Sequence, residues 1–238
     1  QINTDIVFGS NAGTVNCLSA AVLLRGNISG SGSLTKTGTS TLILSGINSY
    51  TGNTFISAGI IEVHNNNALG TGDVYLADNN GGILIGTNSA PATTIVNNRI
   101  FLRGERPSFG FNIQTNKNAI FNGLIVVDRS TNVTKRLNTG TGATMTINGG
   151  ISGLPTMSGI TTMNGNGTFI LSSVPIIFDN TGATGIYSDS GTETVIIAVS
   201  GNRFQNINTG GNLRTDVPFA INNDNVNIGF GPSTLIRN

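Results

Sequence analysis

The feature that most constrains this chain is a short alternation of apolar and polar residues, which returns along its whole length. Such an alternation predicts β-strands of about four to six residues with one buried face. Gly, Asn, Ser and Thr separate the runs, and Gly and Asn accept the positive φ that tight corners require. Runs of this kind include Leu42/Leu44, Ile61/Val63, Val74/Leu76, Ile100/Leu102, Met145/Ile147 and Val195/Ile197. The pattern predicts an all-β protein with many turns.

Composition removes most of the competing classes. Gly, Asn, Thr and Ser supply 116 of 238 residues, and these are poor helix formers, which argues against a helical bundle. An apolar fraction of 37% and a net charge of +1 argue against disorder. The scattered cations give no electrostatic footprint for nucleic acid. No apolar run approaches the roughly 18 residues of a membrane span. We therefore expect a folded segment with no nucleic-acid partner and no membrane insertion.

Longer self-similarity favours stacked units. Residues 25–30 resemble 148–153, residues 38–45 resemble 165–172, and residues 101–104 resemble 23–26. Repetition of this kind is typical of solenoids, whereas sandwiches and closed barrels usually carry more charge and more aromatic residues than this chain, which has no Trp and three Tyr. We predict a right-handed parallel β-helix over residues 1–238, with roughly 20–25 residues in each coil and therefore about ten coils.

The two ends of such a rod expose unpaired strand edges. The sequence shows no charged or Pro-rich cap at either end, so we expect the chain to be a segment of a longer protein. Its partners would be further coils of the same chain or another copy stacked at the ends.

One stretch has a more specific pattern. Residues 32–70 read GSLTKTGTSTLILSGINSYTGNTFISAGIIEVHNNNALG. This stretch resembles the passenger-associated transport repeat of bacterial autotransporters and related surface proteins. The matching positions are Gly32, Leu34, Lys36, Gly38, Thr41, Leu42, Leu44, Gly46, Asn48, Tyr50, Gly52, Thr54, Gly59 and Ala68–Gly70. Ser40 and Ile61 depart mildly from the family pattern.

The resemblance implies a β-helix stalk at the bacterial cell surface or outside the cell, in which the repeat is scaffold and not a catalytic site. In that scaffold we expect Leu42, Leu44, Ile61 and Val63 to fill the core. Gly46 and Gly52 would form corners, and Tyr50 could cover a turn.

Few residues suggest chemistry. His64, the single histidine, is expected to be an exposed residue beside Glu62, and Cys17 a buried structural thiol. The carboxylates are spread evenly, and the calcium-binding nonapeptide repeat is absent. We therefore predict no catalytic, cofactor or metal site. The densest charged patch is Arg99, Arg103, Glu105 and Arg106, which could contact a partner, although ion pairing on a surface loop is the favoured explanation.

The function expected from these features is that of a non-enzymatic, extracellular structural or adhesive β-helix. It would belong to a bacterial surface or secreted protein, as a stalk, adhesin or matrix element, and its ligand could be a surface glycan or a protein. One alternative is a subunit of an extracellular filament that stacks end to end through open coil edges. Another is a carbohydrate-active β-helix enzyme, which would need carboxylates converging in a lateral groove.

Overall fold

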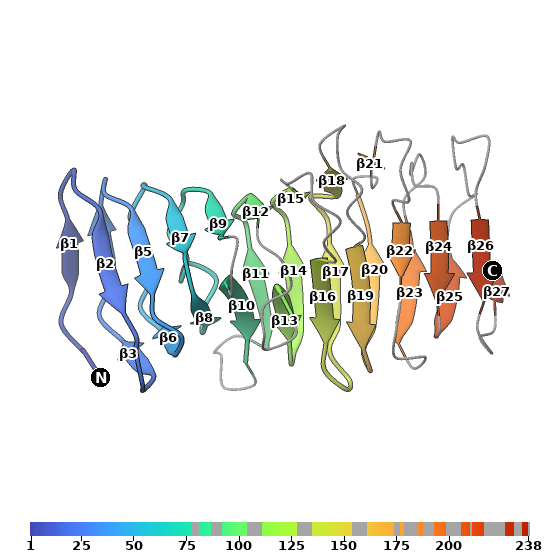
Figure 1. Cartoon of the computed structure of the whole chain (residues 1–238), viewed down its shortest axis with the longest axis horizontal. Coiled ribbons are helices and arrows are strands. Elements are labelled where there is room, and N and C mark those ends of the chain that lie inside the picture. Colours follow the sequence, from blue (N-terminus) through green and yellow to red (C-terminus); the bar gives the residue numbers. More distant parts are fainter. Residues whose placement is uncertain are drawn as a thin grey trace.

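The computed structural model describes most of the chain. The described residues are 1–77, 81–86, 92–103, 111–127, 135–153, 161–173, 177–178, 185–187, 193–198, 206–209, 211–216, 227–230 and 235–237. They form a parallel β-solenoid, with the first strands at one end of a rod and the last strands at the other (Figure 1). These residues contain no helix long and apolar enough to cross a membrane.

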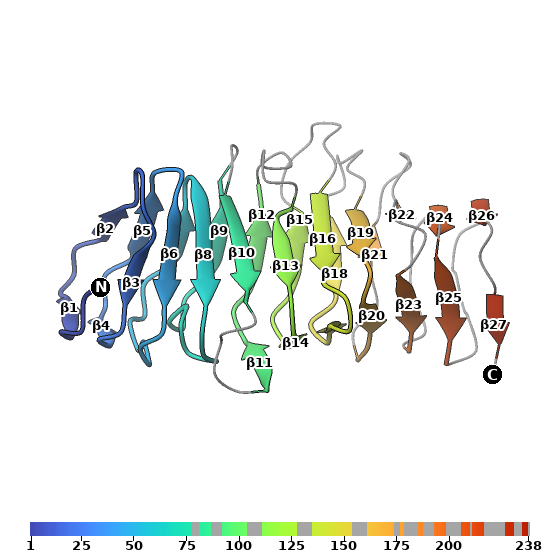
Figure 2. The same ribbon diagram turned by 90° about the horizontal axis from the view of Figure 1, so that it is seen from below.

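Three long sheets make the sides of the rod, and within the described residues they contain ten, eight and seven strands. Figure 2 shows successive strands of the ten-stranded sheet side by side along the rod. This sheet contains β3 (Val22–Leu24), β6 (Thr41–Leu44), β8 (Gly59–Val63), β10 (Gly81–Ile85), β13 (Ile113–Thr115), β16 (Lys135–Thr139), β19 (Thr161–Gly165), β22 (Gly185–Tyr187), β24 (Asn206–Thr209) and β26 (Asn227–Phe230).

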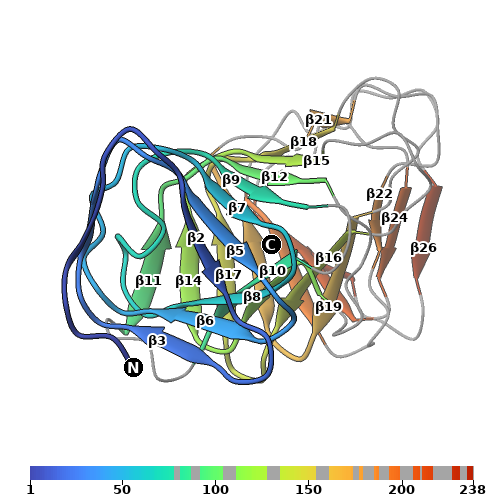
Figure 3. The same cartoon turned by 60° about the vertical axis from the view of Figure 1, so that its left-hand side comes forward.

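The other sides surround the same interior (Figure 3). The eight-stranded sheet contains β2 (Gly13–Asn16), β5 (Leu34–Thr37), β7 (Thr54–Ile56), β9 (Val74–Leu76), β12 (Ile100–Leu102), β15 (Ile125–Val127), β18 (Ile151–Gly153) and β21 (Ile177–Phe178). The seven-stranded sheet contains β11 (Thr93–Val96), β14 (Asn118–Phe121), β17 (Thr144–Ile147), β20 (Thr168–Leu171), β23 (Thr194–Ile197), β25 (Asn212–Thr215) and β27 (Leu235–Arg237). A short sheet pairs β1 (Ile6–Phe8) with β4 (Ile28–Gly30).

The predicted all-β parallel solenoid is confirmed, with one difference in the number of coils. About six coils carry described strands on three sides: β2–β4, β9–β11, β12–β14, β15–β17, β18–β20 and β21–β23. That is fewer than the roughly ten coils expected, although the ten-stranded sheet is crossed ten times within the described residues. Part of the difference arises because the described segments at residues 45–53 and 64–73 pass the third side without forming a strand. The right-handed sense of the winding stays a prediction.

Coil length follows from the strand register. Leu34 pairs with Thr54 and Thr54 with Val74, so the early coils contain 20 residues. Val74 pairs with Ile100, which lengthens the next coil to 26 residues. The three sequence echoes do not follow this repeat. Each joins strands on different sides, for example β6 in the ten-stranded sheet and β20 in the seven-stranded sheet. All sides require the same inward alternation, so similar strand sequences serve any of them.

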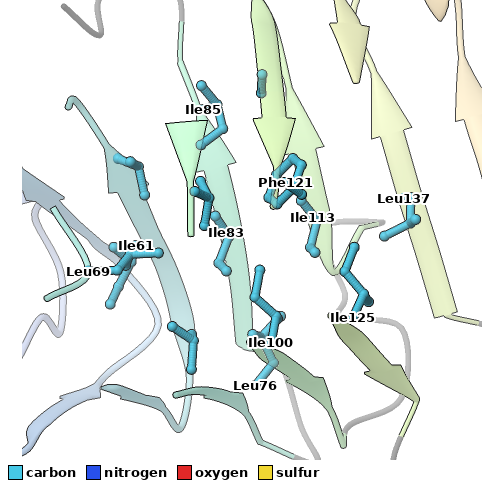
Figure 4. Close-up of a cluster of buried hydrophobic side chains, with 14 of the residues drawn as sticks. Ile61, Leu69, Leu76, Ile83, Ile85, Ile100, Ile113, Phe121, Ile125 and Leu137 are labelled. Atoms are coloured by element: carbon cyan, nitrogen blue, oxygen red, sulfur yellow. The ribbon is translucent and has the colours of Figure 1, made fainter. Parts of the chain in front are cut away.

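The core is a continuous column of mainly aliphatic side chains, and Figure 4 shows one part of it. Along the strands buried and half-buried residues alternate, as in β8, where Gly59, Ile61 and Val63 face inward. The proposed core residues Leu42, Leu44, Ile61 and Val63 all lie in this column, with 0–1% of their surface exposed. Burying each such side chain contributes about 1.5–3 kcal/mol.

Glycines let successive coils approach each other at the corners. A Cβ on Gly46 would overlap the carbonyl of Gly26, and one on Gly52 would overlap the carbonyl of Gly32. Because both contacts are with backbone of the preceding coil, no side-chain movement could relieve them. Gly46 and Gly52 therefore lie where coil spacing demands the absence of a side chain.

Candidate functional site

A column of aromatic rings stands on the outer face of the eight-stranded sheet. Phe55 of β7, Tyr75 of β9 and Phe101 of β12 occupy one register position on successive strands. Their neighbours along each strand are buried, whereas the three rings are half-buried. Ring centroids are 5.2 Å apart between Phe55 and Tyr75 and 4.6 Å apart between Tyr75 and Phe101, with interplanar angles of 15° and 12°. The result is a stack that runs along the rod.

Two arginines from the coil of Phe101 flank this column. The Arg103 guanidinium carbon lies 4.5 Å from the centroid of Tyr75 and 5.8 Å from that of Phe101. The Arg99 guanidinium carbon lies 5.0 Å from the centroid of Phe101. All three distances are within the range of cation–π attraction. We call Phe55, Tyr75, Phe101, Arg99 and Arg103 the aromatic–arginine face.

An aspartate of the preceding coil holds Arg99 in place. The Arg99 Nε donates to Asp73 Oδ1 at 3.2 Å, and the Arg99 Nη2 donates to Asp73 Oδ2 at 2.6 Å. The Tyr75 hydroxyl also donates to Asp73 Oδ2, at 3.5 Å. The hydrogen bonds to Asp73, and then its charge, raise the pKa of Arg99. Half of the Arg99 side chain is nevertheless exposed, 52% against 25% for Asp73. The pair therefore orients a guanidinium that solvent can still reach.

The aromatic–arginine face includes two of the four residues in the charged patch identified from the sequence. Arg99 and Arg103 lie on the aromatic–arginine face, whereas Glu105 and Arg106 lie outside the described residues. Contact of any of these four residues with a partner stays a prediction. Phe55 and Tyr75 were not singled out, and the signal that could have found them is their outward position in two strands 20 residues apart.

His64 lies beside a second surface feature, on the ten-stranded sheet. Its Nε2 is 2.9 Å from Glu62 Oε1, and both side chains are 17% exposed, so the expectation of an exposed histidine is wrong. An open depression next to it is lined by Leu23, Arg25, Ile43, Ser45 and His64. Within the described residues, no three His, Cys, Asp or Glu side chains gather as a metal site would require.

Inside the solenoid, the stretch that resembles the transport repeat contains a buried ammonium. Lys36 Nζ donates to the carbonyls of Thr37 at 2.8 Å, Gly38 at 2.7 Å and Ala58 at 2.9 Å. The residue is fully buried, and burial lowers the pKa of its ammonium. The alternation that places Leu34 inward also places Lys36 inward, so the sequence contained this signal. Its three donors thus bind backbone carbonyls of two successive coils.

Asn48 and Tyr50 extend this internal polar network. Asn48 Oδ1 accepts from the Ile28 amide at 2.8 Å, and its Nδ2 donates to the Ala68 carbonyl at 2.6 Å. Tyr50 is fully buried inside the solenoid, with its ring next to Gly70 at the end of the turn at residues 66–69. Its hydroxyl is 2.6 Å from Thr54 Oγ1, which donates to the Leu69 carbonyl at 3.1 Å. Asn48 thus links the backbones of neighbouring coils directly, whereas Tyr50 reaches the Leu69 carbonyl through Thr54.

Cys17, in the first coil, is buried as expected, with 1% of its surface exposed. Burial raises the pKa of its thiol, and the nearby Lys36 charge opposes that effect. A buried thiol of this kind is mainly protonated at neutral pH and therefore a poor nucleophile.

A comparison with known protein families matches the same stretch of the chain that contains these buried polar residues. The passenger-associated transport repeat family matches residues 34–63, which span β5 to β8 and include Lys36, Asn48 and Tyr50. The chain carries a passenger-associated transport repeat. The match covers about an eighth of the chain, and together with the solenoid fold it is consistent with an autotransporter passenger. Neither the curated proteins nor the solved structures include a match to this chain.

Proposed function

We propose that this solenoid is a non-enzymatic structural segment of a bacterial surface or secreted protein, a stalk whose sides are available for adhesion. The observation that carries the proposal is that the polar side chains of the transport repeat form their bonds inside the solenoid. Its polar residues Lys36, Asn48 and Tyr50 are buried and bind backbone or neighbouring side chains of the solenoid itself. Side chains committed in this way hold coils together and leave none of their polar atoms for a substrate.

Location is tested on the source bacterium. Antibodies raised against the folded chain are expected to label intact cells or to detect the protein in the medium, and external protease should remove the cell-bound signal. Labelling that requires permeabilised cells would contradict the proposal. A cytoplasmic protein labelled in parallel controls for lysis.

The carboxylates support the non-enzymatic part of the proposal. Glu62 is paired with His64, Asp73 with Arg99 and Asp216 with Arg214. Glycoside hydrolysis requires two carboxyl groups facing one bond, and each of these three is paired with a basic side chain instead. Release of reducing or unsaturated ends from acidic or neutral polysaccharides by the purified chain would overturn this part.

A second candidate function is end-to-end assembly with another copy, and the first coil favours it. Strands β1 and β2 each have one neighbour within the described residues, so the other edge of each strand is a place where another copy, or further coils of the same protein, would pair. The same coil exposes three large apolar side chains, Ile2 at 44%, Val7 at 74% and Leu18 at 70%. An open edge beside apolar surface is a site for strand addition.

A further inference from the structure

The aromatic–arginine face combines ring edges with cations on an otherwise weakly charged rod. Because Phe55, Tyr75 and Phe101 stack face to face along the rod, they turn their edges toward solvent. Ring edges carry partial positive charge, opposite in sign to the faces. The Arg103 guanidinium beside them adds positive charge at the same place, and Arg99 adds an exposed guanidinium whose charge Asp73 balances. The face is therefore complementary to an anion that also has apolar C–H surface.

Among the described residues, the register positions on either side of the column differ along the rod. On one side the positions next to Phe55 and Tyr75 are held by Ser57 and Ala77, and the third by Arg103. On the other side Asn53 and Asp73 precede Arg99. Short side chains thus occupy the positions beside Phe55 and Tyr75, whereas the long cationic side chains beside Phe101 include Arg103, whose guanidinium reaches back to the Tyr75 ring. A linear ligand along the rod would meet rings first and guanidinium groups next.

The spacing of the rings restricts the class of ligand. Centroids 4.6 to 5.2 Å apart leave no room for a flat base between two rings. The rings therefore cannot stack with the bases of single-stranded nucleic acid in this way. The same spacing is similar to the length of one pyranose unit. Arginine binds carboxylates through paired donors, and Asp73 demonstrates this geometry for Arg99 within the chain.

We propose that the aromatic–arginine face binds a linear polysaccharide that carries carboxylates, such as a chain of uronic acids, lying along the rod. Sugar C–H groups contact the ring column, and uronate carboxylates contact Arg103 and the exposed part of Arg99. This inference rests on the proposed function, since it supplies the ligand class for an adhesive stalk.

The test compares two polymers that differ in charge. Polygalacturonate is the probe and a neutral galactan its control, with binding measured by affinity electrophoresis and calorimetry at low and moderate salt. The purified chain is expected to bind polygalacturonate and to ignore the galactan, with affinity falling as salt rises. The double substitution Arg99→Gln and Arg103→Gln is expected to weaken binding at least tenfold.

A matched control variant exists on another side of the rod. Arg214 is also exposed and also binds an aspartate with two donors, Asp216, but it belongs to the seven-stranded sheet. Arg214→Gln is expected to leave the affinity unchanged, which separates a site from general attraction of a polyanion. Tyr75→Leu keeps an apolar outward residue, and it should weaken binding while circular dichroism and thermal unfolding report an intact solenoid.

Several outcomes would overturn the inference. They are equal binding of both polymers, equal loss in the Arg214→Gln variant, tighter binding of an oligothymidylate than of polygalacturonate, and no binding by the folded chain. None of these outcomes bears on the surface location tested by antibodies. The polysaccharide site can therefore be disproved while the proposed structural role is kept.

Discussion

Lys36 places a full positive charge inside an aliphatic core and matches it with three carbonyls instead of a carboxylate. Removing the ammonium leaves those carbonyls with fewer donors, whereas burial of the charge itself opposes folding. The three charge-assisted bonds are the larger effect, since each contributes about 1.5–3 kcal/mol. We expect Lys36→Met to lower the free energy of unfolding by about 2–3 kcal/mol. Urea unfolding would measure this, with Lys117→Met at a half-buried lysine as the control. A Lys36→Met variant as stable as the parent would contradict the assignment.

Tyr50 should make the solenoid sensitive to alkali. Burial raises the pKa of its phenol well above the ordinary value of 10.0. The folded state therefore keeps this proton at a pH where the unfolded chain releases it, so stability is lost as the pH rises above 10.0. We expect Tyr50→Phe to be less stable than the parent by about 1 kcal/mol at neutral pH, because the bond to Thr54 is lost.

The difference between parent and Tyr50→Phe should shrink above about pH 10 and then reverse. Comparing the two proteins at each pH cancels the contributions of Cys17 and Lys36, which titrate in both. A difference that stays constant from neutral to strongly alkaline pH would refute the buried phenol as the cause.

At the scale of the element, Asn48 joins three successive passes of the chain, at Ile28, at its own position and at Ala68. Asn48→Ala leaves one buried donor and one buried acceptor without partners, and we expect a loss of about 2 kcal/mol. Hydrogen exchange gives a local readout, since the amide of Ile28 should lose protection while amides in β20 keep theirs. The exposed ladder residue Asn122, which links Asn97 and Asn148, is the matched control. Equal effects of Asn122→Ala and Asn48→Ala would contradict the special role of the buried amide.

The sequence predicts which residues form strands, but it does not predict which strands pair with one another. Alternation identifies the inward residues Leu42, Leu44, Ile61 and Val63 because burial imposes a period of two on every side. Register depends instead on loop length, which changes from 20-residue to 26-residue coils after Val74. For that reason the sequence revealed Arg99 and Arg103 as a charged patch but not their position beside Phe55 and Tyr75.

At the scale of the whole molecule, the solenoid saturates its backbone by pairing each coil with the next, so its sides and its ends have different properties. The sides carry side-chain ladders, such as the aromatic column, that do not depend on another copy. The ends carry backbone edges that do. A surface stalk needs only the sides, whereas a filament also needs the ends, and the two functions can therefore be separated by mutation.

The end-to-end candidate predicts concentration-dependent association that a lysine on β1 would weaken. Lysine on an edge strand opposes strand addition through its charge and its solvation. Val7→Lys is therefore expected to shift the chain toward monomers in sedimentation velocity and to shorten any rods seen by electron microscopy of unfixed protein.

Ile47→Lys is the matched control for Val7→Lys. It introduces the same charge at a similarly exposed side chain, 67% against 74%, but in a coil whose backbone already bonds to Asn27 of the coil before it. Association through the end coil predicts a strong effect of Val7→Lys and none of Ile47→Lys. If both lysines weaken association equally, the contact is a general effect of surface charge. If the parent chain is monomeric at every concentration, the solenoid acts through its sides alone.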